Sequence, residues 1–164
     1  MAVPRVIEPL DIRITGWMRR NSVLLTRIAL GLIYTWFGAL KFFPALSPAE
    51  ELASRTIEQI SFGRLGPPAS LYLLALWEVA IGLGLLAGRF LRVTLFLLFL
   101  QMAGTLLPLV LFPERTFTAL PYAPTLEGQY IIKNLVLIGA ALVVGATVRG
   151  DPIPAPPPGA GRKA

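Results

Sequence analysis

The sequence contains no cysteine and no histidine among its 164 residues. The absence of cysteine excludes disulfides, iron–sulfur clusters and thiolate metal sites. Without histidine, this chain alone is not expected to bind haem, zinc or copper. We therefore expect no metal site and no covalent cofactor, and no catalytic residue can be assigned from the sequence.

Charged residues are also scarce, at 15% of the chain, whereas hydrophobic residues make up 55%. The apolar residues come in long uninterrupted runs, which is typical of an integral membrane protein in contact with the lipid bilayer. The net charge of +6 comes largely from arginines that stand beside these runs. That placement indicates orientation in a membrane, and we expect no nucleic-acid partner.

The stretch RIALGLIYTWFGALKFFP at 27–44 shows the pattern most clearly. Its polar and small residues recur at spacings of four and three, on one helical stripe: Arg27, Gly31, Tyr34, Gly38 and Lys41. The remaining positions are apolar. A polar stripe on an apolar background predicts a transmembrane helix whose polar face meets other helices.

Four segments are long enough to cross a hydrocarbon core of about 30 Å: 23–44, 69–87, 92–112 and 129–148. The predicted fold class is all-α, a four-transmembrane-helix up-down-up-down bundle, with a short outer-surface helix over 48–60 between spans 1 and 2. The predicted divisions are a basic interfacial segment at 1–22, the transmembrane domain at 23–148 and a disordered Pro-rich tail at 149–164. Pro4 and Pro9 are expected to break any long helix in the first segment.

Basic residues are unevenly distributed between the two ends of the predicted spans. One end has nine: Arg5, Arg13, Arg19, Arg20, Arg89, Arg92, Arg149, Arg162 and Lys163. The other has three: Arg55, Arg64 and Arg115. Because cytoplasmic loops are enriched in Lys and Arg, we expect both termini in the cytoplasm.

Ionisable residues within the predicted spans each cost about 3 kcal/mol or more at the bilayer centre. Counting along the spans places Lys41, Glu78 and Lys133 in the outer half of the bundle. Other polar residues at similar depth complete the predicted ligand-binding set: Gln101, Thr105, Tyr34, Tyr130 and Asn134. Two ammonium groups and one carboxylate leave an excess positive charge. Such a cluster suits a small anion or the carbonyl oxygen of a quinone.

Other interpretations of the same residues remain open. The two lysines can extend to the outer headgroups, and Arg27 to the inner ones. Glu78 can be a protonated acid that hydrogen-bonds between helices. The polar cluster is also compatible with a small-solute or ion transporter, or with a structural scaffold that binds no ligand.

Three stretches resemble the DoxX family of small four-helix membrane proteins: WFGALKFFP at 36–44, ALWEVAIGLGLL at 75–86 and EGQYIIKNLVLIGAALVVGA at 127–146. The resemblance extends over about 25–145. It implies a four-helix membrane fold in the bacterial envelope, and we therefore expect the protein in the bacterial inner (cytoplasmic) membrane. It also implies similarity to membrane subunits of thiosulfate:quinone oxidoreductases and to members associated with oxidative-stress complexes. On this basis we expect an accessory subunit with a redox partner protein and a bound quinone, and a homo-oligomer is compatible with it.

Overall fold

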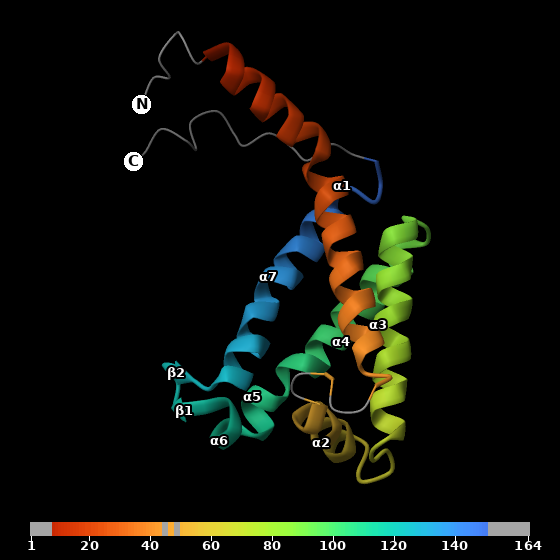
Figure 1. Cartoon of the computed structure of the whole chain (residues 1–164), viewed down its shortest axis with the longest axis vertical. Helices are drawn as coiled ribbons and strands as arrows, with labels where there is room; N and C mark the ends of the chain where they lie inside the picture. Colours follow the sequence, from red (N-terminus) through yellow and green to blue (C-terminus); the bar gives the residue numbers. More distant parts are fainter. Residues whose placement is uncertain (1–7, 44–45, 48–49, 151–164) are drawn as a thin grey trace.

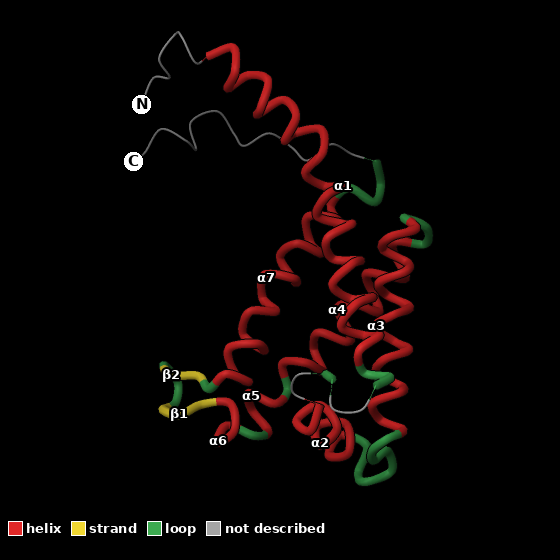
Figure 2. The backbone as a smooth tube through the Cα atoms, viewed as in Figure 1, coloured by secondary structure: helices red, strands yellow, loops and turns green. Residues whose placement is uncertain are grey.

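The computed structural model describes residues 8–43, 46–47 and 50–150, and these residues are mostly helical (Figures 1 and 2). Its elements, in chain order, are α1 (Glu8–Leu40), α2 (Glu50–Ile60), α3 (Ala69–Ala87), α4 (Leu91–Leu106), α5 (Pro108–Leu111), α6 (Pro113–Thr116), β1 (Phe117–Ala119), β2 (Ala123–Pro124) and α7 (Leu126–Ala146). The predicted disordered tail lies outside the described residues from 151 onward, as do Pro4 and Pro44.

Four helices in the described part of the chain are long and apolar enough to cross a membrane: α1, α3, the continuous α4–α5 segment Leu91–Leu111, and α7. They run in alternating directions (Figure 1). One end of the bundle, here called the α2 end, carries α2, α5, α6 and the short strands. The opposite end carries the start of α1, the α3–α4 turn and the end of α7. The predicted all-α architecture with four spanning helices is confirmed.

The predicted surface helix is present as α2. Its buried residues are Leu52, Ser54 and Thr56, whereas Glu51, Arg55 and Glu58 are exposed. The Ser54 hydroxyl lies 2.9 Å from that of Ser70, at the start of α3. This buried hydrogen bond attaches α2 to the bundle.

The expectation that Pro9 prevents a long N-terminal helix is wrong. Helix α1 begins at Glu8 and continues without interruption into the first span. Pro9 lies in the first turn, where a backbone N–H has no partner within the helix, so the missing donor has no consequence. The boundary expected near residue 22 is therefore not a helix boundary.

The segment between α5 and α7 contains structure that the sequence did not indicate. Strands β1 and β2 pair antiparallel, with Phe117 opposite Pro124. Thr125 caps α7, because its hydroxyl accepts a hydrogen bond from the Gly128 N–H at 3.1 Å and donates one to the Arg115 carbonyl at 2.7 Å. The hairpin and α6 are thus tied to the start of α7.

The core lies between α1, α3, α4 and α7. Its most deeply buried large side chains are Leu30, Ile81, Leu85, Leu98 and Val144, none more than 2% exposed. All five lie between the middle of the bundle and its opposite end. The large exposed apolar residues elsewhere on the spanning helices form the surface that faces lipid.

Candidate functional site

Helices α1 and α3 approach closely because glycines stand at their contact. A Cβ on Gly38 would lie 2.8 Å from Glu78 Cβ, which is closer than Cβ atoms approach in real structures, and 3.0 Å from Val79 N. A Cβ on Gly31 would lie 3.1 Å from the Gly82 carbonyl oxygen. This close packing brings the end of α1 against the middle of α3, where Glu78 lies.

Lys41 and Glu78 form an ion pair at this contact. The Lys41 Nζ lies 2.6 Å from Glu78 Oε2, and the two side chains are only 12% and 10% exposed. Lys41 immediately follows the last residue of α1, and its ammonium also donates to the Phe37 carbonyl at 3.3 Å. Each charge therefore compensates the other in a region that water reaches poorly.

Gln101 of α4 extends the pair into a third helix. Its Nε2 donates to Glu78 Oε1 at 3.0 Å and to Thr105 Oγ1 at 2.9 Å. Its Oε1 accepts a hydrogen bond from the Tyr34 hydroxyl at 3.0 Å. Both amide protons and the amide oxygen of this buried side chain are thus hydrogen-bonded.

We call these five residues the Lys41–Glu78 network: Tyr34, Lys41, Glu78, Gln101 and Thr105. All were among the predicted site residues, and the structure brings them into direct contact across α1, α3 and α4. The network contains one ammonium and one carboxylate. It is therefore neutral overall, without the excess positive charge expected from the sequence.

The other three predicted residues lie on α7, outside the network. Lys133 is exposed, and its Nζ lies 5.8 Å from the centre of the Tyr130 ring, which is itself exposed. Asn134 is half-buried. Within the described residues, the structure records no ion pair between Lys133 and Glu78, so the expected meeting of two lysines at one carboxylate does not occur.

Arg27, which lies on the predicted polar stripe of α1, contacts another helix, although the sequence did not indicate which atoms it would bind. Its guanidinium donates to the carbonyl oxygens of Leu85 and Leu86 at 2.5 and 3.4 Å. These carbonyls belong to the last turn of α3, where a cation interacts favourably with the helix dipole. Arg27 therefore ties α1 to the C-terminus of α3.

A second charged group joins α2, α6 and α7 at the surface of the α2 end. Arg115 contacts Glu51 at 3.0 Å and Glu127 at 3.7 Å, and Glu51 also pairs with Arg55 at 2.8 Å. The hydrogen bond from Arg115, and then its charge, lower the pKa of the Glu51 carboxyl. The Glu51–Arg55 spacing of four residues is a recognisable helical pair, whereas nothing in the sequence indicated the contact with Arg115.

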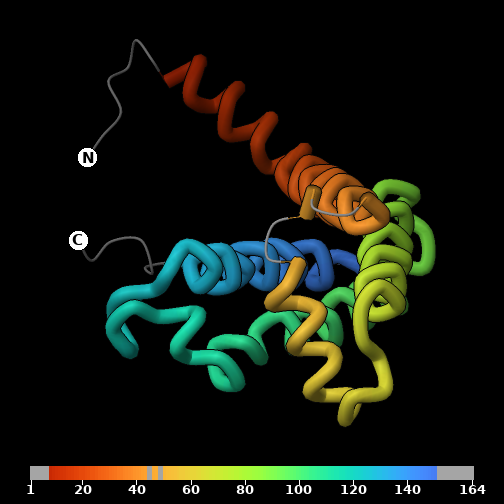
Figure 3. Tube along the Cα trace, turned by 60° about the horizontal axis from the view of Figure 1, so that its bottom comes forward, coloured from red at the N-terminus to blue at the C-terminus, as the bar shows by residue number. Residues whose placement is uncertain are grey.

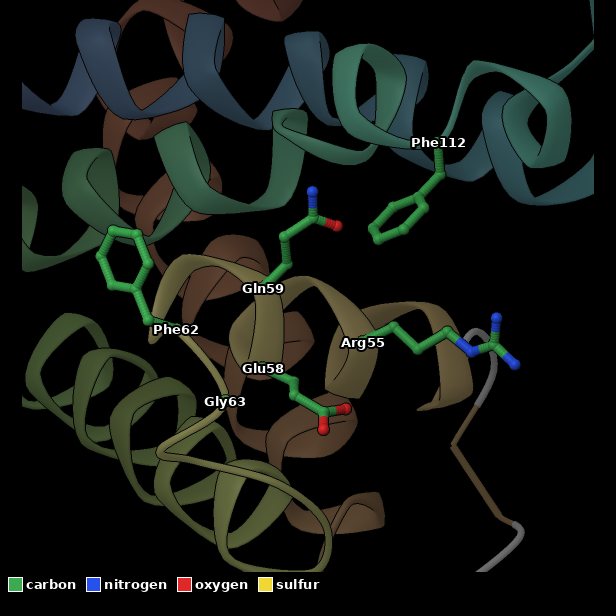
Figure 4. Close-up of a pocket in the computed structure, with 6 residues that line it drawn as sticks. All are labelled: Arg55, Glu58, Gln59, Phe62, Gly63 and Phe112. Atoms are coloured by element: carbon green, nitrogen blue, oxygen red, sulfur yellow. The ribbon is translucent and has the colours of Figure 1, made fainter.

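Two depressions of about 630 and 510 Å³ lie beside α2. In the larger one, Gln59 of α2 and Phe112, which follows α5, point into the space from opposite sides (Figure 4). Neither depression is lined by a member of the Lys41–Glu78 network. Both depressions are therefore separate from the network.

The DoxX family model matches residues 22–112, which is more than half of the chain. The matched region contains α1 from its spanning part onward, α2, α3, α4 and α5, and with them all five residues of the network. Comparison with curated proteins and with solved structures found no match. With four helices able to span the bilayer, this chain is an integral membrane protein and belongs to the DoxX family.

Proposed function

We propose that this protein is an accessory membrane subunit of a redox complex, and that the Lys41–Glu78 network binds the headgroup of a quinone. The proposal rests on one observation: the buried Glu78 carboxylate of α3 accepts hydrogen bonds from the Lys41 ammonium and from the Gln101 amide of α4, whose amide oxygen accepts one from the Tyr34 hydroxyl of α1. Buried ionisable groups at membrane depth are costly, and such groups commonly mark functional sites.

The charge balance of the network favours a neutral ligand. Lys41 already compensates Glu78, so a free anion would meet no uncompensated positive charge. A quinone carbonyl is a neutral hydrogen-bond acceptor that can take the Lys41 ammonium as donor, while Glu78 keeps its hydrogen bond from Gln101. Lys41 lies just beyond α1, so its long side chain can turn toward a ligand that enters from the bilayer.

The proposal includes an orientation. The opposite end of the bundle carries most of the arginines, so it faces the cytoplasm of a bacterial cell. The network then lies in the outer half of the inner membrane, on the side of the bilayer that a redox partner protein outside the cytoplasm can reach.

The test is quinone binding to the purified protein in lipid nanodiscs, measured with a short-chain quinone analogue. We compare the wild type with the double variant Lys41→Met/Glu78→Gln, which removes both charges and so leaves no unpaired ion. We expect at least about a tenfold loss of affinity, equivalent to about 1.4 kcal/mol. Lys133→Met is the matched control, because it removes a lysine outside the network. The affinity of this variant for the quinone analogue should equal that of the wild type.

A scaffold that binds no ligand is the second candidate, favoured by the complete hydrogen bonding of Gln101. In that case the double variant changes thermal stability and leaves quinone affinity unchanged. Equal binding by wild type and double variant would therefore overturn the quinone site and support the scaffold.

A further inference from the structure

Helix α1 is much longer than a membrane crossing requires. Its 33 residues extend about 50 Å at 1.5 Å per residue, against a hydrocarbon core of about 30 Å. If its end near Lys41 marks one edge of the core, the first dozen or so residues lie beyond the other edge. Figures 1 and 3 show this part of α1 extending past the other helices, with no described element beside it. We call Glu8–Asn21 the α1 arm.

The arm has an apolar stripe that no described element covers. Leu10, Ile14, Trp17 and Met18 are all exposed and share one side of the helix. Residues seven positions apart lie on the same side of a helix, so the stripe continues from Met18 to Leu25 and Leu32 in the spanning part, which are also exposed. The stripe is therefore an extension of the surface that faces lipid.

Basic residues accompany this stripe. Arg13, Arg19 and Arg20 are exposed on the other sides of the arm, against the acidic residues Glu8 and Asp11 near its start. Three more exposed arginines lie at the same end of the bundle, Arg89 and Arg92 at the α3–α4 turn and Arg149 after α7. This end of the molecule thus combines a strong positive charge with an apolar stripe that includes a tryptophan.

We propose that the α1 arm is a membrane-surface element that recognises anionic phospholipid headgroups. Trp17 and its apolar neighbours enter the boundary between headgroups and acyl chains, and the arginines bind the lipid phosphates. The charges argue against a second copy of the arm as the occupant. If two copies paired in parallel along this stripe, Arg13 and Arg20 of one copy would lie at the edge of the contact, opposite Met18 and Leu25 of the other copy. Neither arginine would then face an acidic residue.

The chain has no cysteine, so a single introduced cysteine can be labelled without background. We place an environment-sensitive fluorophore on Met18→Cys in the full chain and reconstitute it in nanodiscs of phosphatidylcholine alone or with phosphatidylglycerol. With phosphatidylglycerol we expect a blue-shifted emission and loss of quenching by a water-soluble quencher. Phe62→Cys, exposed at the α2 end, is the matched control and should respond equally in both lipids.

The charge contribution is tested with Arg13→Gln/Arg19→Gln/Arg20→Gln in the labelled protein. The binding of the arm to phosphatidylglycerol relative to phosphatidylcholine should fall by about fivefold for each arginine removed. Arg64→Gln at the α2 end should leave this ratio unchanged. Molar salt should weaken the wild-type preference in the same way, which tests the charge without a mutation. Helicity measured by circular dichroism confirms that the arm is still folded.

Two results would overturn the proposal. One is a fluorophore that stays equally accessible to water in both lipids. The other is energy transfer between labelled copies that rises with protein density and does not depend on lipid charge, which would identify a second copy as the occupant of the stripe.

Discussion

Glu78 is the residue on which the polar interior depends. Its Oε2 accepts a hydrogen bond from Lys41, the residue that follows α1, and its Oε1 accepts one from Gln101 of α4. A buried ion pair contributes little net stability, since removing two charges from water offsets their attraction. Loss of one partner is different, because it leaves an uncompensated charge in a medium that solvates it poorly.

We therefore predict that Lys41→Met destabilises the protein by about 3 kcal/mol, and that Lys41→Met/Glu78→Gln recovers most of this loss. The measurement is reversible unfolding of both variants in the same detergent or lipid. Lys133→Met should stay within about 0.5 kcal/mol of the wild type because its side chain is exposed. A double variant less stable than the single one would show that the pair itself is strongly stabilising.

The sequence predicted the network residues of α1, α3 and α4 because two physical constraints act on them. Helical periodicity puts Tyr34 and Lys41 on one stripe, and the rise per residue puts Glu78 and Gln101 near their depth. Depth does not fix the rotation of a helix about its own axis. Lys133 has a suitable depth, yet α7 is turned so that this side chain is exposed.

At the scale of the elements, the contact between α1 and α3 is the most extensive helix pair in the described structure. Transmembrane helices gain little from burying apolar surface against each other, so close backbone packing through small residues takes that role. Among the glycines of this contact, Gly38 is the one at which an added Cβ would meet Glu78.

Gly38→Ala should separate α1 from α3 and lower the free energy of unfolding by about 1–3 kcal/mol, the usual cost of overpacking. It should also lengthen the distance between Lys41 and Glu78. Gly104→Ala is the matched control, because a Cβ there meets nothing within 4 Å. That variant should be neutral or slightly stabilising, and equal melting temperatures for the two variants would contradict this account of the contact.

Helix α2 should respond to acid through Glu51. The pKa of this carboxyl is lowered in the folded protein, so its stabilising contact with Arg115 is fully present above the unfolded value of about 4.3. The contact is lost as the pH falls through the lower folded value. Proteolysis or labelling of α2 should therefore increase in that acidic range. In Glu51→Gln, which cannot titrate, the accessibility of α2 should not change with pH over the same range. Because the group is exposed, molar salt should reduce the effect.

Element boundaries were predictable where hydropathy changes sharply, as at α3, which agrees with its predicted range of 69–87. They were not predictable where a polar sequence continues a helix. The α1 arm contains Gly16 and several charges, but nothing in it is incompatible with helix once Pro9 lies in the first turn. The strands β1 and β2 are too short to show an alternating pattern.

For the whole molecule, the number and direction of spans follow from long apolar runs, because backbone groups in lipid must be satisfied within each helix. Which helices contact each other does not follow, since the helices are apolar on nearly every side. The sequence also gave no indication that the depressions beside α2 would be separate from the polar network.

The packing between the network and the opposite end of the bundle predicts that the protein has no open pathway for ions. Leu30, Ile81, Leu85 and Leu98 fill the bundle there, each at 2% exposure or less. We expect proteoliposomes containing the wild type to retain protons and small ions as well as empty liposomes do. A flux that appears with the wild type and disappears with Glu78→Gln would instead support the transporter.

The ion pair joins the first two spanning helices in the order of synthesis, because Lys41 and Glu78 are only 37 positions apart in the sequence. A lone charge at the centre of a helix that leaves the translocon costs about 2.5–3.5 kcal/mol. Because the two charges are carried by consecutive segments, they can partition into lipid together as a neutral helical hairpin. The nascent chain can thus complete its most expensive insertion step before α4 and α7 have left the ribosome.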